Sequence, residues 1–277
     1  AEGQTHTIDS IVFAQDGKIL ISSGDGGTAQ FAEPNALRAQ DLTSLNGKIL
    51  RVNDDGSAPG DNPFDDGTNS NRSRVLSYGL RNPYRLTLHP TTFDLYLGDV
   101  GWNTYEEFDR GKGKNFGWPC YEGSLPQPLY QSTFPAQCAT VASDPLLTLP
   151  LLSYNHSVGQ AAVGGPFYTG TVYPEQYRNN WFVSDYGANW IRRLIFNTAG
   201  NLTSSPFFAT NVAAPVTIAQ GPDGLLYYVS FTTGQIRRIR YNGPSAVASA
   251  TPSSGYSPLS VTFSSAGSSD PTGGTLT

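Results

Sequence analysis

The sequence predicts an all-β protein of the β-propeller type, and three observations lead to that prediction. Thirty Gly, twenty Pro, 12% aromatic residues and no Met favour many short strands and tight turns over helices. Short segments that alternate polar and apolar residues recur along the chain, as half-buried antiparallel strands do. A strand, an Asp-Gly turn and a second strand repeat at 15–20 and 222–227, with a weaker copy at 92–96. Repeated β units without helices are typical of propeller blades, and a sandwich or barrel is the competing architecture.

The segment that ends at Ser73 begins with the strongest hairpin signal, an Asp-Gly turn between two apolar runs. The elements expected there, in order, are two strands within 9–22, a flexible loop at 24–27, a helical turn near 35–40, a strand at 47–52 and a long surface loop. Asp25, in the Gly-rich loop, is either a site residue at one end of the sheets or a turn residue.

The stretch from Tyr78 to Pro119 concentrates turn residues and polar groups around a hairpin with strands at 85–88 and 94–97. Pro83 restricts the preceding residue to extended backbone. Arg81 and Asn82 are therefore expected at the mouth of a strand rather than buried.

After the second strand of this hairpin, Gly98 and Gly101 allow tight turns whose exposed carbonyls suit a hard cation. The acidic side chains that follow supply nearby charge; they are Glu106, Glu107 and Asp109. The alternative is that they form a solvated acidic edge and that Arg81 is a surface ion-pair partner.

The rest of the chain to residue 243 contains a Pro-rich excursion at 119–150 and then further strands. These are expected at 165–170, 181–184, 190–195, 215–218, 225–229 and 235–240. At about 40–45 residues per blade, residues 1–243 hold five blades, or six if the loops are short. The composition changes at Pro244. Residues 244–277 contain one alternating strand at 258–263, and they are either a disordered linker or the opening of a second β-domain.

Charge and cysteine content limit the function classes. The net charge of -5 argues against a nucleic-acid partner, which needs a basic surface. The sequence contains no apolar run long enough to span a membrane and no signal peptide, and it starts within folded-looking sequence, so we expect a processed or partial chain. Cys120 and Cys138 favour one disulfide over two free thiols. Together with glycosylation sequons at Asn71, Asn155 and Asn201, this predicts a secreted protein.

An ordered set of motifs resembles the glucose/sorbosone dehydrogenase family. The matching segments are 47–52, Asp-Asn-Pro-Phe at 61–64, Arg-Asn-Pro at 81–83, Asn-Phe-Gly-Trp-Pro at 115–119, 221–224 and 234–239. Those enzymes are six-bladed propellers that bind pyrroloquinoline quinone (PQQ) and calcium, so the resemblance implies a six-bladed propeller over residues 1–243. One alternative is that this propeller is incomplete at its N-terminus. The tail from Pro244 resembles the start of a PKD domain, an immunoglobulin-like module.

The resemblance also implies roles for individual residues. His6 occupies the place of the family's catalytic base, whose neutral imidazole takes a proton from the sugar hydroxyl. In the family an Asp precedes this His and orients it; here Thr5 stands there, so an orienting partner must come from elsewhere. Arg81 and Asn82 match residues that hold the cofactor.

For calcium, Gly101 and Trp102 match a turn whose backbone carbonyls ligate the ion, with Trp in place of the usual Pro. Glu107 and the carbonyl of Phe116 resemble parts of a second, structural calcium site, and ordinary surface charge is the alternative. For His156 a structural role is favoured, and the alternative is that it lines the same end of the sheets as the site. His89, in the hairpin turn, is interpreted as structural.

The chain departs from the family at positions where its best-known members place a Lys and two Arg around the cofactor's carboxylates. Here these regions read Tyr186-Gly187-Ala188 and Ala213-Ala214-Pro215. Two hypotheses follow. The first is PQQ- and calcium-dependent oxidation of an aldose or related sugar at its anomeric carbon. The alternative is a non-catalytic propeller that binds extracellular carbohydrate or a surface polysaccharide.

Overall fold

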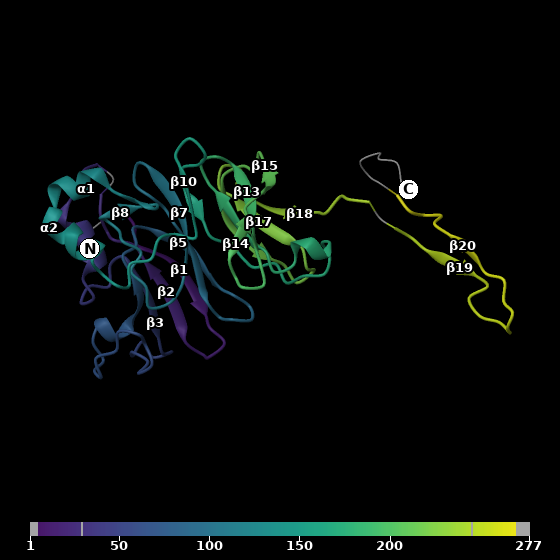
Figure 1. The fold of residues 1–277 in the computed structure, drawn as a ribbon, viewed down its shortest axis with the longest axis horizontal. Coiled ribbons are helices and arrows are strands. Elements are labelled where there is room, and N and C mark those ends of the chain that lie inside the picture. Colours follow the sequence, from purple (N-terminus) through teal and green to yellow (C-terminus); the bar gives the residue numbers. More distant parts are fainter. Residues whose placement is uncertain (1–4, 29, 245, 270–277) are drawn as a thin grey trace. The chain divides into compact units, whose positions relative to one another are not determined.

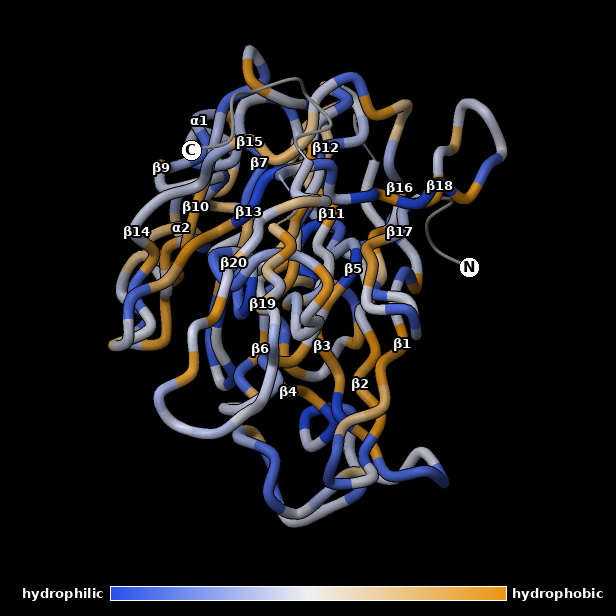
Figure 2. Tube along the Cα trace, turned by 90° about the vertical axis from the view of Figure 1, so that its right-hand side faces the viewer, coloured by the Kyte–Doolittle hydropathy of each residue, from blue (hydrophilic) through white to orange (hydrophobic). Residues whose placement is uncertain are grey.

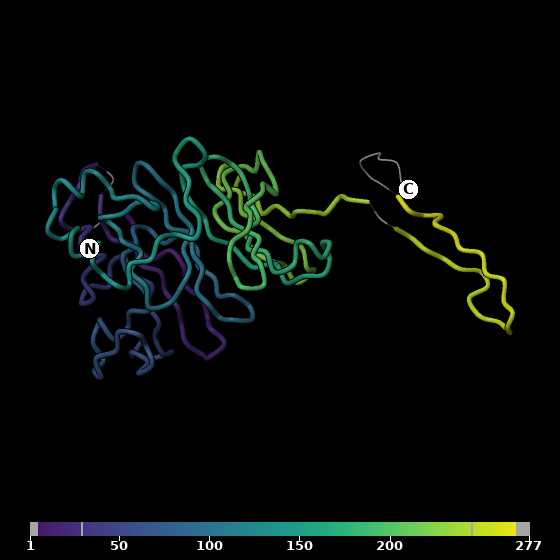
Figure 3. The backbone as a smooth tube through the Cα atoms, in the orientation of Figure 1, coloured from purple at the N-terminus to yellow at the C-terminus, as the bar shows by residue number. Residues whose placement is uncertain are grey.

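Antiparallel sheets follow one another along the chain in this computed structural model, which describes residues 5–28, 30–244 and 246–269 (Figures 1 and 3). The first sheet contains β1 (Ile8–Phe13), β2 (Ile19–Ser23), β3 (Lys48–Val52) and β4 (Val75–Tyr78), in that order. The second contains β10 (Leu152–Asn155), β7 (Tyr105–Arg110), β6 (Leu95–Asp99) and β5 (Pro83–Leu88). The third contains β11 (Ala162–Val163), β12 (Trp181–Asp185), β13 (Trp190–Phe196) and β14 (Leu202–Ser204), and β15 (Phe207–Thr210) also pairs with β13. The fourth contains β16 (Pro215–Gln220), β17 (Leu226–Ser230) and β18 (Gln235–Ile239).

The sheets are arranged as neighbouring blades, because their first strands contact each other in sequence order. Strand β1 lies against β5, β5 against β11, and β11 against β16. Glycine permits the close approach of the second and third sheets, since a Cβ at Gly98 would lie 2.7 Å from the nitrogen of Gly164. The described residues form four such sheets, and the predicted number of six blades is not confirmed.

Large aromatic and aliphatic side chains fill the space between the sheets. Between the second and third sheets, Tyr96 packs edge-on against Trp181, with ring centroids 5.2 Å apart, and both are buried. Between the first and second sheets the core is aliphatic and includes Leu20, Ile49 and Leu97. Figure 2 shows apolar residues along β1 and β2, as the alternating sequence pattern predicted.

The Pro-rich excursion after the second sheet folds differently from the sequence prediction. It contains the two-stranded pair β8 (Tyr121–Glu122) and β9 (Leu125–Pro126), followed by α1 (Pro128–Thr133) and α2 (Pro135–Ala142). Each helix starts with a proline, and the Gln127 side chain accepts the N–H groups of Leu129 and Tyr130 to cap α1. Sequence reasoning read these prolines as loop signals, whereas here they occupy helix N-termini.

Cys120 and Cys138 form the predicted disulfide, with an S–S distance of 2.04 Å, and both are fully buried. We expect the Cys120→Ser/Cys138→Ser double variant to lose about 3 kcal/mol of unfolding free energy, because the bridge closes a short loop in the unfolded chain. Urea denaturation monitored by tryptophan fluorescence would measure this loss. Reduced wild-type protein is the control and should match the variant. Equal midpoints for oxidised and reduced wild-type protein would contradict the prediction.

Three short 3-10 helices lie between the strands of the described chain. The 3-10 helix η1 (Pro34–Gln40) confirms the expected helical turn, and η2 (Arg72–Arg74) and η3 (Glu175–Tyr177) were not predicted.

The strand expected at 165–170 is wrong. The strand that pairs with β12 is β11, and within 165–170 only Phe167 makes an isolated bridge, to Trp181. No helix in the described part of the chain has the length and apolar composition needed to cross a membrane.

The chain divides into two units, Ala1–Arg238 and Ile239–Thr277. In the second unit, β19 (Ser249–Thr251) pairs antiparallel with β20 (Thr262–Ser264), and its large side chains are exposed. The expected strand at 258–263 is therefore displaced toward its C-terminal end. The PKD-like fold stays a prediction, and residues 270–277 of the tail lie outside the described residues.

Candidate active site and buried carboxylate cluster

The β1–β2 hairpin brings His6 and Asp25 together. Ile8 pairs with Ser23 at the open end of this hairpin, so residues just before β1 lie beside residues just after β2. His6 Nδ1 is 2.7 Å from Asp25 Oδ1. Asp25 is therefore placed to orient His6, the role that Thr5 does not fill in this chain. The register of the predicted hairpin is the sequence signal that could have identified it.

The Asp25 carboxylate is buried and held at both oxygens. Gly27 donates its N–H to Oδ1 at 2.8 Å, and the indole Nε1 of Trp118 donates to Oδ2 at 2.7 Å. Because an ionised carboxylate only accepts hydrogen bonds, Nδ1 of His6 is the donor in their contact and carries the proton. The lone pair of His6 is then on Nε2, which is the arrangement a general base requires.

Arg81 lies at the same end of the sheets, in the corner between β4 and β5. Its backbone carbonyl accepts the N–H of Asp25 at 2.8 Å, which joins this corner to the His6 loop. Its Nη1 donates to the carbonyls of Val100 at 2.9 Å and Gly101 at 2.5 Å. The prediction that Arg81 is presented rather than buried is wrong, since the residue is 5% exposed. It is buried because its guanidinium reaches inward to the carbonyls that follow β6.

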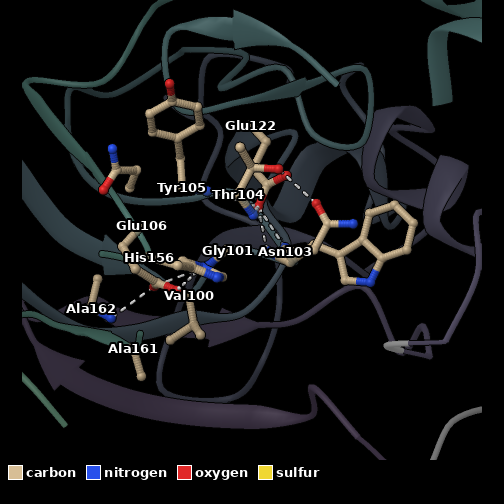
Figure 4. Close-up of polar contacts among 12 residues, drawn as sticks. Val100, Gly101, Asn103, Thr104, Tyr105, Glu106, Glu122, His156, Ala161 and Ala162 are labelled. Carbon is tan, nitrogen blue, oxygen red and sulfur yellow. Dashed lines mark hydrogen bonds and ion pairs between the residues drawn. The ribbon is translucent and has the colours of Figure 1, made fainter. Parts of the chain in front are cut away.

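The turn at Gly101 and Trp102 is folded around a single carboxylate. The N–H groups of four consecutive residues, 102–105, donate to Glu122 Oε1 at 2.8, 2.8, 2.9 and 3.1 Å (Figure 4). Only glycine fits at Gly101, because a Cβ there would lie 1.6 Å from the Tyr105 carbonyl oxygen. Sequence reasoning missed Glu122, which lies in β8 beyond the loop and carried no motif signal.

Glu106 connects this turn to the next sheet (Figure 4). Its Oε2 accepts the N–H of Gly101 at 3.1 Å and that of Ala162 at 2.9 Å, and its Oε1 contacts His156 Nε2 at 3.1 Å. The hydrogen bond to Glu106 raises the pKa of His156. Glu106 is fully buried, so the alternative of a solvated acidic edge is wrong for this residue. The structural interpretation of His156 agrees with its contact to Glu106.

Three further carboxylates, Asp99, Glu107 and Asp109, form a buried cluster on β6 and β7. Asp99 is the cross-strand neighbour of Glu107, and Asp109 follows two residues later on the same face. One oxygen of each lies within 4.8 Å of the others. Glu107 and Asp109 are buried because β7 is a central strand flanked by β6 and β10. The solvated-edge alternative is therefore wrong for these two residues as well.

The three carboxylates differ in the number of hydrogen bonds that they accept. Asp99 accepts the N–H groups of Arg81 at 2.9 Å and Asn82 at 2.6 Å, and Glu107 accepts that of Gly123 at 2.8 Å. Neither oxygen of Asp109 has a hydrogen-bond partner among the described residues. Burial raises the pKa of Asp99 to about 7. Burial and repulsion between neighbouring carboxylates raise the pKa values of Glu107 and Asp109 well above their ordinary range. Such a set of oxygens either holds protons or binds a hard cation.

The structure thus links His6, Arg81 and Gly101 through Asp25 and the Arg81 contacts. Asn82 and Glu107 are joined to them through Asp99, which accepts the N–H of Asn82 and is the cross-strand neighbour of Glu107. Phe116 lies in the core between the first and second sheets, where it is 2% exposed among aliphatic side chains. Its backbone N–H donates to the Tyr78 carbonyl at 2.9 Å.

The residues present fit part of a polyanionic cofactor. Arg81 Nε is buried without a hydrogen-bond partner in the described part of the chain, so this donor is available to an acidic group. Tyr186 occupies the region of the family's Lys and packs edge-on against Phe231, with centroids 5.9 Å apart. Two other cations, Arg85 and Arg192, stack on aromatic rings, Arg85 over Tyr84 at 4.3 Å and Arg192 over Phe207 at 4.2 Å. Among these residues, Arg81 is therefore the candidate partner for one acidic group of such a cofactor.

A family model described as glucose/sorbosone dehydrogenase matches residues 1–238. The chain belongs to the glucose/sorbosone dehydrogenase family. Among curated members, the HIPL2 protein of Arabidopsis thaliana is 34% identical over 254 residues, which cover 80% of this chain and 35% of that protein. The aldose sugar dehydrogenase YliI of Escherichia coli is 36% identical over 110 residues, covering 39% of this chain and 28% of that enzyme.

Solved structures of two aldose sugar dehydrogenases share the fold. The apo-form of the soluble aldose sugar dehydrogenase from Escherichia coli superimposes with a TM-score of 0.65 at 25% identity, over 82% of this chain and 62% of that one. The PQQ-bound aldose sugar dehydrogenase from Streptomyces coelicolor gives 0.64 at 21% identity, over 86% and 62%. The chain therefore spans only part of the length of these relatives.

Proposed function

We propose that this family member oxidises an aldose or related sugar at its anomeric carbon, using PQQ and calcium. The observation that carries the proposal is the His6–Asp25 pair, with its 2.7 Å contact, at the same end of the sheets as Arg81 and the Gly101 turn. A base whose tautomer is fixed in this way can remove the proton of a sugar hydroxyl.

In this mechanism, Nε2 of His6 accepts the proton of the anomeric hydroxyl. Asp25 keeps Nδ1 protonated and stabilises the imidazolium that forms, because its own charge is held in place by Trp118 and Gly27. PQQ supplies a hydride acceptor when it is bound. Arg81 would hold an acidic group of the cofactor through its Nε, which has no hydrogen-bond partner among the described residues. Asn82, the next residue, would hold the cofactor beside it.

Calcium has two candidate locations in this proposal. The carbonyls of Gly101 and Trp102 are hard oxygen donors beside Arg81, although the Gly101 carbonyl already accepts a bond from Nη1 of that residue. The second location is the buried cluster of Asp99, Glu107 and Asp109, where a divalent ion would neutralise mutually repelling carboxylates.

A non-catalytic module that binds extracellular carbohydrate is the second candidate. The observation that favours it is the apolar and uncharged character of 186–188 and 213–215, where cations would be needed to grip the remaining carboxylates of the cofactor. In both cases we propose a secreted protein that meets a small sugar or a surface polysaccharide, and the buried disulfide supports an oxidising compartment.

Titration of the calcium-loaded protein with PQQ in a calorimeter, followed by dye reduction with a panel of aldoses, tests the proposal. We expect binding at micromolar cofactor and sugar-dependent reduction that disappears in His6→Ala. If PQQ does not bind at micromolar concentration while a polysaccharide does, the dehydrogenase proposal fails and the binding module replaces it.

A further inference from the structure

Trp118 contacts three parts of the candidate site with one side chain. Its indole Nε1 donates to Asp25 Oδ2 at 2.7 Å, across 93 positions of sequence. The guanidinium carbon of Arg81 lies 5.6 Å from the centroid of its ring. Trp102, in the Gly101 turn, packs edge-on against it with centroids 6.2 Å apart. The ring therefore touches the partner of the base, the candidate cofactor-binding cation and the candidate calcium turn.

The indole is itself held rigidly. Trp118 is 3% exposed and belongs to a core cluster that includes the disulfide and Tyr130, whose ring centroid lies 5.3 Å away. Its backbone N–H donates to the Gly79 carbonyl at 3.0 Å, and its carbonyl accepts from Gln40 Nε2 at 2.7 Å. A donor fixed at backbone and ring can fix the group to which it donates.

Two other buried tryptophans show what an indole N–H does in a purely structural role. Trp181 donates to the Gly165 carbonyl at 2.7 Å, and Trp190 donates to the Val158 carbonyl at 3.0 Å. Both acceptors are neutral backbone groups. Trp118 instead donates to a side-chain carboxylate whose other oxygen contacts His6.

We propose that Trp118 is a positioning residue for the base: it locks the Asp25 carboxylate and, through it, the ring orientation and tautomer of His6. Only the kinetic consequence of this inference rests on the proposed function. Without the indole donor, Oδ2 is left buried without that partner, and the carboxylate is free to turn away from Nδ1. A displacement of the base by about 1 Å is enough to lower the turnover rate by about 10- to 100-fold.

The test is Trp118→Phe, which keeps an aromatic face toward Arg81 and removes the indole donor. The first readout is the proton NMR signal of the hydrogen-bonded Nδ1–H of His6 in cofactor-free protein. It can be assigned by its absence in His6→Gln, because the chain has only 3 His. The second readout is the division of the kinetic effect between kcat and KM for the sugar.

Trp190→Phe is the matched control, since it removes one buried indole donor from the core of the third sheet. We expect Trp118→Phe to lose the His6 signal and to lower kcat about 10- to 100-fold with little change in KM, whereas Trp190→Phe retains both. Retention of the His6 signal in Trp118→Phe overturns the inference. If wild-type protein shows the signal and Trp118→Phe loses it while no sugar is oxidised, the positioning role stands and the proposed function fails.

A second measurement covers the case in which Trp118→Phe does not fold. In ¹⁵N-labelled protein, Asp25→Asn is expected to move the indole ¹H–¹⁵N signal of Trp118 and leave those of Trp181 and Trp190 in place. An unmoved Trp118 signal overturns the inference.

Discussion

Asp25→Asn is expected to lower the rate of sugar oxidation by about 10²- to 10⁴-fold, the range that a positioned general base contributes. The amide offers one acceptor oxygen where the carboxylate offers two, while His6, Gly27 and Trp118 all donate to this side chain. It also removes the charge that stabilises the imidazolium formed when Nε2 accepts the substrate proton. The binding of PQQ is expected to change little, because the guanidinium of Arg81 donates to backbone carbonyls at 100 and 101 and does not depend on the Asp25 carboxylate for its position.

Steady-state dye reduction at saturating sugar measures this effect, and calorimetry measures PQQ binding. Asp16→Asn is the matched control, because Asp16 lies at the opposite end of the same hairpin, where it pairs with Arg51 at 2.7 Å on the surface. The control should retain its activity. Turnover of Asp25→Asn within twofold of wild type would remove Asp25 from the mechanism and leave it as a turn residue.

The buried carboxylate cluster is expected to make the calcium-free protein less stable as the pH rises through about 7. Burial raises the folded-state pKa of Asp99 to about 7, and those of Glu107 and Asp109 are raised well above their ordinary values. A raised pKa in the folded state gives stability that is fully present below the unfolded pKa and is lost as the pH rises from there through the folded pKa. For Asp99 alone the loss is on the order of 4 kcal/mol, because each tenfold change in proton affinity between the folded and unfolded chain corresponds to about 1.4 kcal/mol.

Thermal unfolding in chelator at pH 5, 7 and 8.5, with and without added calcium, measures this dependence. Calcium should raise the Tm most at the highest pH, because the carboxylates must lose their protons to bind the ion and do so more completely as the pH rises. Asp109→Asn should raise the stability of the calcium-free protein at pH 8.5 by a few kcal/mol, since it removes a buried charge with no hydrogen-bond partner among the described residues.

Asp185→Asn provides the contrast for that variant. Asp185 is equally buried but accepts bonds from Tyr154 at 2.9 Å, Ala161 at 2.9 Å and Ala188 at 2.6 Å. Its replacement should destabilise the protein, because its charge is satisfied. If Asp109→Asn is less stable than wild type in chelator at pH 8.5, the cluster is not the source of the pH dependence.

The sequence alone predicted the strands whose patterns and turns are local. The alternation around Asp16-Gly17 and the strands near 85–88 and 94–97 appear in the structure close to their expected limits, as β1, β2, β5 and β6. The disulfide was also predictable, because two cysteines allow a single intramolecular pairing. These features depend on neighbours within a few residues or on elimination, so no tertiary information is needed to find them.

The tertiary structure alone decided which side chains work together. The sequence left open whether Glu106, Glu107 and Asp109 supply charge beside a cation or form a solvated edge, and the central place of β7 in the second sheet buries all three. The partners of Asp25 and of the Gly101 turn, Trp118 and Glu122, come from distant or unpatterned positions. A local pattern records whether a side chain can face a core, but hydrogen bonds between loops depend on how separate sheets meet. That arrangement is set by packing across the whole unit.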